Sequence, residues 1–215
     1  MKLNLNTKQN FRNKFLDECL NHVPFDGWSE KSIDLSLTNL KIKREFFLEN
    51  FPNGAEDVIK FYLEDSDNKM VKEFKKNKNI LTSMTKKVKS LILIKLNQSK
   101  NNKDVIRKTI FWLGLPQNSK IAINTLYRTV DTIWRTAGDT STDSSFYSKR
   151  ILLSGVYSST LLAYLGDDGN DMEKTEKFLD RRLDNVLKIP KLINPIKGTV
   201  GDILKFSKSF SKFNI

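Results

Sequence analysis

The sequence predicts an all-helical protein. Apolar residues recur at positions i, i+3 and i+4 through most of the 215 residues, which is the spacing of one face of an α-helix. No run of alternating apolar and polar residues is flanked by a hairpin turn, the pattern typical of paired strands. Stretches rich in Pro, Gly and Asn divide the chain into segments of helical length. These three observations favour a bundle of helices.

The first helix is expected over residues 7–21. Phe11 and Phe15 lie four residues apart there and share one helical face. Pro24 and Gly27 should end this helical region, because proline removes a backbone donor and glycine favours turns.

Two further short helices are expected before residue 53. Ser29 is a good N-cap and should begin a helix over 29–39. A third helix, over 43–50, carries Phe46 and Phe47. Three short helices with tight connections are typical of a helix-turn-helix unit.

A longer helix is expected over 55–76, directly after Pro52 and Gly54. The polar and glycine-rich breaks that follow separate five more helical segments. These segments cover residues 82–98, 103–113, 119–136, 147–165 and 171–187.

The C-terminal part predicts a tether and an amphipathic helix over 199–213. Pro190 and Pro195 interrupt the chain before it, and lysines then lie opposite a broad apolar face. This is the pattern of a helix that lies in a membrane surface, although docking on its own domain or on a partner is an open alternative. The expected membrane-binding residues are Ile203, Leu204, Lys205, Phe206, Lys208, Phe210, Lys212 and Phe213.

These segments group into three parts. Residues 1–53 form a helix-turn-helix-like N-terminal subdomain, residues 54–190 a helical ligand-binding domain, and residues 191–215 the tether and amphipathic helix. A chain of this length buries a sufficient core without disulfides, and its single cysteine, Cys19, permits no internal disulfide.

The net charge of +12 invites a nucleic-acid interpretation. The 29 Lys and 8 Arg accompany many Asn and Ile, a bias that AT-rich coding alone produces. Thirteen basic residues lie between Lys69 and Lys108 against only two acids. This basic band is either a solvated helix face or a surface for an anionic membrane or partner.

The predicted helix-turn-helix lacks the side chains of a DNA reader. A recognition helix needs basic and short polar groups around it, but this one offers Phe46, Phe47 and Glu49. Charges across residues 28–50 also cancel. We therefore expect no nucleic-acid partner.

No residue pattern predicts catalysis, a bound metal or a cofactor. His22 is the single histidine, and beside Pro24 at a helix end it suits packing or capping. Asp139 and Asp143 lie at a helix boundary, where N-capping of the next helix explains both. We expect a protein that is not an enzyme.

The middle helices carry more apolar surface than one-sided packing requires. The surplus either fills a core or surrounds a hollow interior, and the pattern alone leaves both open. The candidate lining residues are Leu91, Ile94, Phe111, Trp112, Ile123, Leu126, Tyr127, Val130, Leu153, Tyr157 and Leu161.

A candidate partner surface lies at residues 134–150, WRTAGDTSTDSSFYSKR. Polar corner residues sit there between two helical runs with aromatics on both sides, and an aromatic anchor ringed by charge is typical of interaction hot spots. Arg150, one turn after Phe146, should pair with Asp139 or Asp143. The expected site comprises Trp134, Asp139, Asp143, Phe146, Tyr147 and Arg150.

That run resembles a motif of the Coq-nine family of ubiquinone-biosynthesis accessory proteins, relatives of the TetR repressors. The stretches HVPFDGW (22–28) and LPQN (115–118) resemble it too, in the same order. The resemblance implies a TetR-like bundle with a degenerate helix-turn-helix, a bound isoprenoid or phospholipid, and a possible homodimer. It also implies a partner, the di-iron demethoxyubiquinone hydroxylase Coq-seven. Ser144 stands where family members commonly have an aromatic residue.

The resemblance implies a protein that takes polyprenylated ring intermediates from the membrane and presents them to the hydroxylase. The alternatives are a TetR-like transcription regulator and a helical interaction protein without a ligand. No segment predicts a membrane span, because Lys95 stops the apolar run Leu91–Ile94. Without a clear targeting segment, we expect a cytoplasmic protein at the inner face of a bacterial plasma membrane.

Overall fold

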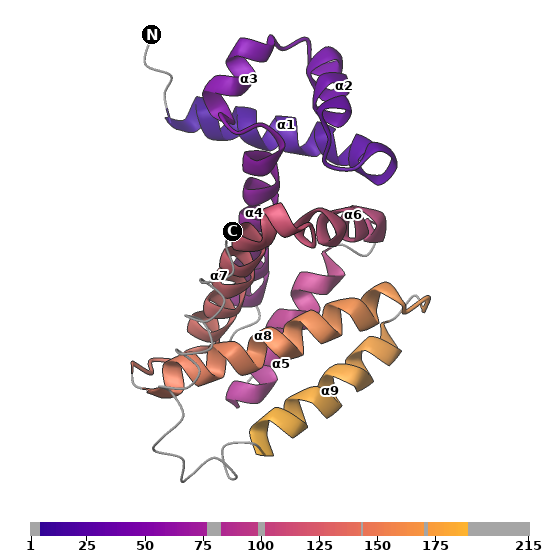
Figure 1. The fold of residues 1–215 in the computed structure, drawn as a ribbon. Helices are drawn as coiled ribbons and strands as arrows, with labels where there is room; N and C mark the ends of the chain where they lie inside the picture. Colours follow the sequence, from indigo (N-terminus) through magenta and orange to yellow (C-terminus); the bar gives the residue numbers. More distant parts are fainter. Residues whose placement is uncertain (1–4, 77–82, 99–101, 143, 170–171, 189–215) are drawn as a thin grey trace, which may run out of the picture.

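The computed structural model describes residues 5–76, 83–98, 102–142, 144–169 and 172–188 (Figure 1). Within these ranges every regular element is a helix, which confirms the predicted all-α class. The elements are α1 (Leu5–Asp26), α2 (Glu30–Leu40), α3 (Arg44–Asn50), α4 (Ala55–Lys76), α5 (Met84–Asn97), α6 (Lys103–Leu113), the short 3-10 helix η2 (Pro116–Asn118), α7 (Ser119–Ala137), α8 (Ser144–Leu165) and α9 (Glu173–Lys188).

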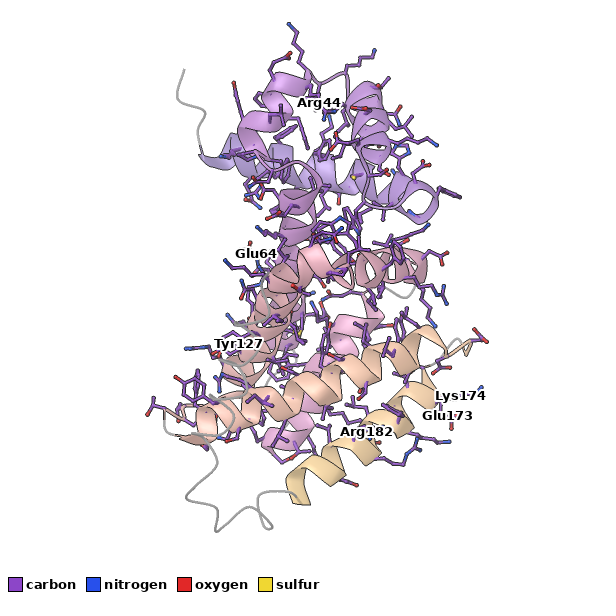
Figure 2. The ribbon with its side chains drawn as sticks, viewed as in Figure 1. Arg44, Glu64, Tyr127, Glu173, Lys174 and Arg182 are labelled. Carbon is purple, nitrogen blue, oxygen red and sulfur yellow. The ribbon has the colours of Figure 1, made fainter. Side chains whose placement is uncertain are left out.

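Helices α1, α2 and α3 pack around the start of α4 at one end of the molecule (Figure 1). Phe15, Phe47 and Phe51 lie at the centre of this N-terminal unit, with ring centroids 4.8 to 5.6 Å apart. Fully buried aromatic rings make large contributions to the stability of such a small core. Arg44, at the start of α3, instead lies outside this core and pairs with Glu30 and Asp34 on α2 (Figure 2).

Helix α1 continues past Pro24, which the sequence predicted as part of its end. The proline removes one backbone donor, but the next turn still closes because Gly27 N–H donates to the Val23 carbonyl at 2.9 Å. Gly27 then ends the helix with a φ of 70°, a left-handed conformation that glycine adopts without strain. The first helix is therefore longer than predicted.

The other helix starts are close to the predictions, with one shift at α8. Ser29 caps α2 as predicted, since its hydroxyl accepts from the backbone N–H of Ser32. Helix α8 begins at Ser144, three residues before the predicted Tyr147. The polar run before Tyr147 thus contributes the first turn of the helix.

Helix α4 leaves the N-terminal unit and runs into a bundle formed with α5, α7, α8 and α9 (Figure 1). Helix α5 lies against α4, α7 and α9, and α8 packs on α7 and α9. The main core of this bundle comprises Met70, Phe74, Val88, Leu91, Ile92, Leu96, Ile106, Val130, Ile133, Ala137, Leu153, Val156, Tyr157, Tyr164, Leu179 and Leu183.

The basic band does not form one free surface in the described residues. Lys89 on α5 pairs with Glu176 and Asp180 on α9. Lys95 is buried against Asp67, and Lys103 donates to the backbone carbonyl of Asp167. Part of the predicted positive excess therefore holds helices together rather than facing solvent.

The predicted C-terminal helix over 199–213 lies outside the described residues, as do its membrane-binding candidates. In the described part of the chain, no helix combines the length and apolar character needed to cross a membrane.

Candidate functional site

A pocket of about 330 Å³ lies between α4, α5, α6, α7 and α8. This volume is at the lower end of the range for small-molecule sites. Most of its wall is apolar, formed by Leu63, Leu96, Ile106, Ile110, Leu113, Ala122, Leu126, Leu161 and Leu162. The remaining lining residues are Tyr62, Ser66, Lys95, Thr109, Gly114, Thr125, Thr129, Tyr157 and Ser158.

The pocket has an inner end and an outer end. Lys95 on α5 is only 6% exposed, and Thr129 is buried beside it. Leu162 on α8, also a lining residue, is 61% exposed, and Gly114 at the end of α6 is exposed as well. The mouth therefore lies between the end of α6 and the C-terminal half of α8, and it is apolar.

Three of the eleven predicted lining residues, Leu126, Tyr157 and Leu161, do line the pocket. Leu91, Val130 and Leu153 lie in the main core instead, and Ile94 packs against that core. Trp112 packs against the N-terminal core. Phe111 and Ile123 point to solvent, as does much of Tyr127, which is labelled in Figure 2. These eight residues do not form the wall.

A charged cluster closes the inner end of the pocket. The Lys95 ammonium donates to Asp67 Oδ1 at 2.7 Å and to Ser66 Oγ at 3.1 Å. Asp67 also accepts from the Thr129 hydroxyl at 3.0 Å and from Arg128 Nε at 3.3 Å. Burial lowers the pKa of Lys95, and the neighbouring Asp67 carboxylate offsets part of that effect.

Two features of the sequence correspond to this cluster. Lys95 interrupts the apolar run of α5 and lines the pocket. Ser66 and Asp67 occupy the apolar face of α4, where two polar residues in succession are unusual. A polar residue on an apolar helix face indicates either a hydrogen-bond partner on another helix or a ligand-binding site.

The α7–α8 corner holds a second cluster, built around Arg150. This side chain is 2% exposed, and its Nε donates to Asp131 Oδ1 at 2.7 Å. Its Nη1 reaches Asp139 Oδ2 at 3.3 Å, so the predicted pair with Asp139 is present. Asp131 on α7 is the additional partner, which the sequence did not predict. Asp143, the other predicted partner, lies outside the described residues.

Asp139 is the acceptor that connects this corner. Its carboxylate accepts from Lys149 Nζ at 2.6 Å and from the Ser141 hydroxyl at 2.7 Å, besides Arg150. Burial alone would raise the pKa of Asp139, but these hydrogen bonds outweigh it and hold the pKa below its usual value. The corner is therefore fixed by charge-assisted hydrogen bonds.

The aromatic residues of the corner divide into inner and outer groups. Trp134 is partly buried and its indole N–H donates to the Lys149 carbonyl at 3.0 Å. The Phe146 ring covers the Arg150 guanidinium, with 3.4 Å from Cζ to the ring centroid. Tyr147 packs edge-on against Phe146 and is 65% exposed. Of the described candidates, Tyr147 is the one that offers most surface to a partner.

The remaining titratable candidates have structural surroundings. His22 Nε2 lies 3.1 Å from Glu18 Oε1, and Asn39 donates to the same carboxylate. Cys19 is buried in the N-terminal core, and burial raises its pKa to about 11. Among the described residues, no group of three His, Cys, Asp or Glu side chains could hold a metal ion.

Comparison with known proteins connects this architecture to a family. The family model COQ9, that of the Coq-nine family, matches residues 120–190. The ubiquinone biosynthesis protein COQ9-A of Xenopus laevis is 26% identical over 212 residues, covering 90% of this chain. The probable ubiquinone biosynthesis protein coq9 of Dictyostelium discoideum is 28% identical over 196 residues, covering 87% of the chain. The chain is therefore similar to the COQ9 proteins along most of its length.

The matched COQ9 range includes all of α7 after its first residue and the whole α7–α8 corner. The chain spans 63% of the length of both the Xenopus and the Dictyostelium COQ9 proteins. The predicted resemblance to the COQ9 family is thus confirmed by matches along most of the chain.

The fold has a solved counterpart among bacterial regulators. The crystal structure of the TetR transcriptional regulator from Nitrosomonas europaea superposes with a TM-score of 0.69 at 17% identity. It covers 83% of this chain and 98% of the regulator. At this identity the likeness shows the fold alone, and the predicted TetR-like fold is confirmed.

The expected bacterial plasma-membrane location is wrong. The COQ9 relatives are mitochondrial proteins of frogs, rat and Dictyostelium. The expectation rested on the lack of a clear targeting segment. That lack does not distinguish a bacterial chain from a mitochondrial one.

Proposed function

We propose that this protein binds a lipid in the pocket formed by helices α4 to α8. It acts, without catalysing a reaction, as an accessory in ubiquinone biosynthesis. The observation that carries the proposal is the largely apolar pocket of about 330 Å³. It lies in a chain that resembles COQ9 proteins over about 90% of its length. The COQ9 relatives are named ubiquinone biosynthesis proteins, and intermediates of that pathway carry apolar tails.

The pocket provides an alternative to the bilayer for such a molecule. A polyprenyl tail holds its ring in the membrane, and each Å² of apolar surface moved into water costs about 25 cal/mol. An apolar wall removes that penalty. At about 30 Å³ for each water-sized group, the pocket holds roughly eleven non-hydrogen atoms, so a long tail must continue through the apolar mouth.

One face of α8 connects this mouth with the α7–α8 corner. Tyr147, Ile151, Ser158 and Leu162 fall within about 60° of one another at 100° per residue. Ser158 and Leu162 line the pocket, whereas Tyr147 and Ile151 are exposed. A partner seated on Tyr147 and Ile151 therefore lies along the same helix face as the mouth. We propose that this partner is the di-iron demethoxyubiquinone hydroxylase.

Binding to a membrane surface through residues 199–213, and formation of a homodimer, remain part of the same proposal.

DNA reading has less support than lipid binding. Arg44, the first residue of α3, is already paired with Glu30 and Asp34, and Phe47 of α3 is buried. A recognition helix requires such side chains to be available to the groove.

Filling the pocket should release the lipid. Ala122 lines the pocket, so Ala122→Phe places a ring inside it, and we expect the purified variant to lose most of its bound lipid. Ile123 is the next residue and points to solvent, so Ile123→Phe is the matched control. Native mass spectrometry with lipid extraction measures both. Equal lipid content in the two variants would contradict binding in this pocket.

Truncating Tyr147 should weaken hydroxylase binding. Tyr147→Ala removes an exposed aromatic anchor, and we expect a loss of about 1–3 kcal/mol in binding free energy, with the melting temperature nearly unchanged. Phe25→Ala is the control, since Phe25 is an exposed aromatic residue of the N-terminal unit. Calorimetric titration of the hydroxylase would measure both. A similar loss from both variants would show that Tyr147 is not a specific contact.

A further inference from the structure

We infer that the inner end of the pocket is a head-group site, in which Lys95 and Tyr157 donate hydrogen bonds to an oxygen atom of the bound lipid. The inference rests on the proposed lipid binding and deepens it. It assigns the class of ligand, a single-tailed amphiphile with an acceptor oxygen, and the direction in which that ligand lies.

Tyr157 is the first observation. Its side chain is 8% exposed and lines the pocket from α8. Among the described residues its hydroxyl has no hydrogen-bond partner, although a buried hydroxyl is normally paired. The Tyr164 hydroxyl is unpaired and fully enclosed by protein, but the Tyr157 hydroxyl is not fully enclosed. The Tyr157 hydroxyl therefore opens on the pocket interior and is available to a ligand.

Lys95 is the second and independent observation. An ammonium group has three N–H donors, and two of them go to Ser66 and Asp67. The third has no acceptor in the described part of the chain. Arg128 Nη2 is likewise buried without a partner. The inner end thus has more donors than acceptors.

The charges at the inner end of the pocket also show an excess of positive groups, in agreement with the excess of hydrogen-bond donors. Asp67 is shared by Lys95, Arg128 and Thr129, so one buried carboxylate faces two cations. Glu64, labelled in Figure 2, is 4.0 Å from Arg128 and lies on the exposed side of α4. Burial disfavours the charged form of Lys95 and lowers its pKa. A ligand oxygen would supply the missing acceptor and stabilise the ammonium.

The two ends of the pocket then fix the orientation of the ligand. The head group lies inward at Lys95 and Tyr157, and the tail passes Leu161 toward the exposed Leu162 at the mouth. In this orientation the reactive ring is hidden while the lipid is bound. Delivery to an enzyme therefore requires release of the whole molecule from the pocket, and the chemistry occurs on the enzyme.

The test compares two probes with the same tail by native mass spectrometry of the full chain: decyl-benzoquinone, whose ring has two carbonyl oxygens, and decylbenzene, whose ring has none. We expect the quinone to bind more tightly. Tyr157→Phe should weaken quinone binding about threefold to tenfold, the value of one neutral hydrogen bond. Lys95→Met should weaken it about tenfold to a hundredfold, since its donor is charged. Neither change should alter decylbenzene binding.

Tyr164→Phe is the matched control. Tyr164 is a buried tyrosine of α8 with an unpaired hydroxyl, but it does not line the pocket, so its variant should bind both probes as the original protein does. Tyr157→Phe removes no protein hydrogen bond and should fold normally, which keeps the test valid if Lys95→Met does not. Decanoic acid is a third probe, and selective loss of decanoate binding would identify a carboxylate rather than a quinone oxygen.

Two results would overturn the assignment. An equal loss for decyl-benzoquinone and decylbenzene would show that the variants only distort the pocket. Unchanged quinone affinity in Tyr157→Phe and Lys95→Met would show that the donors are not used. If the original protein binds none of the probes, lipid binding itself is wrong, and the head-group site is excluded with it.

Discussion

Replacing Asp67 with Asn should destabilise the protein by about 3–5 kcal/mol, the usual effect of removing one partner of a buried ion pair. Asp67 is 3% exposed and accepts from Lys95, Thr129 and Arg128. An amide at this position offers one acceptor and directs an N–H₂ group at these donors. Lys95 then remains buried without a counter-charge. Urea unfolding followed by circular dichroism would measure the change.

A neighbouring acid on the same helix provides the control. Asp65 pairs with Lys69 across one turn of α4 at the surface, so Asp65→Asn should cost about 0.5 kcal/mol or less. Combining Asp67→Asn with Lys95→Met should recover part of the loss, because an apolar side chain needs no counter-charge. An Asp67→Asn variant as stable as Asp65→Asn would contradict a buried, charged cluster.

The boundaries of several helices follow from local chemistry that the sequence displays. Pro52 and Gly54 precede α4, whose observed bounds, Ala55–Lys76, are those expected. Helix α6 likewise matches its prediction. Pro24 was misleading, because a proline near a helix C-terminus removes only one bond and the last turn can still form. Local signals therefore locate breaks well where glycine, proline and polar residues occur together.

The pocket was less predictable for a physical reason. Apolar periodicity identifies which face of a helix is buried, and Val130 and Leu153 are indeed buried. It does not identify where opposing faces fail to fill space, since this depends on side-chain volumes across several helices. The pocket wall includes short residues such as Ala122, Thr125 and Ser158. A candidate list chosen by large apolar side chains favours the filled regions.

Ion pairs between different helices also could not be predicted from the sequence. Arg150 was expected to pair with an acid near its own turn, and Asp139 fulfils that expectation. Asp131 lies 19 positions before Arg150, on α7, and only the packing of α7 against α8 brings it within 2.7 Å. Composition and spacing indicate that a buried arginine needs acids, but the fold decides which ones.

Replacing Asp139 with Asn should destabilise the protein by about 3 kcal/mol at neutral pH, since it removes the shared acceptor of Lys149 and Arg150. This loss should depend on pH. The folded-state pKa of Asp139 lies below its usual value, so the carboxylate contributes its full stability above the unfolded pKa of about 3.9 and loses it as pH falls through the lower folded value. The difference between the two proteins should therefore shrink as the pH falls below about 4.

Asp168→Asn is the control for Asp139→Asn, because Asp168 is exposed on the loop after α8 and its replacement should change stability by less than about 0.5 kcal/mol. Thermal and urea unfolding of the three proteins from pH 7 to pH 2 would give the comparison. A stability difference at Asp139 that stays constant over this range would show that the amide acts through altered packing. A difference that shrinks with acid would show that the Asp139 charge holds Lys149 and Arg150 in place and, through Arg150, supports the Phe146–Tyr147 pair that we propose as the partner contact.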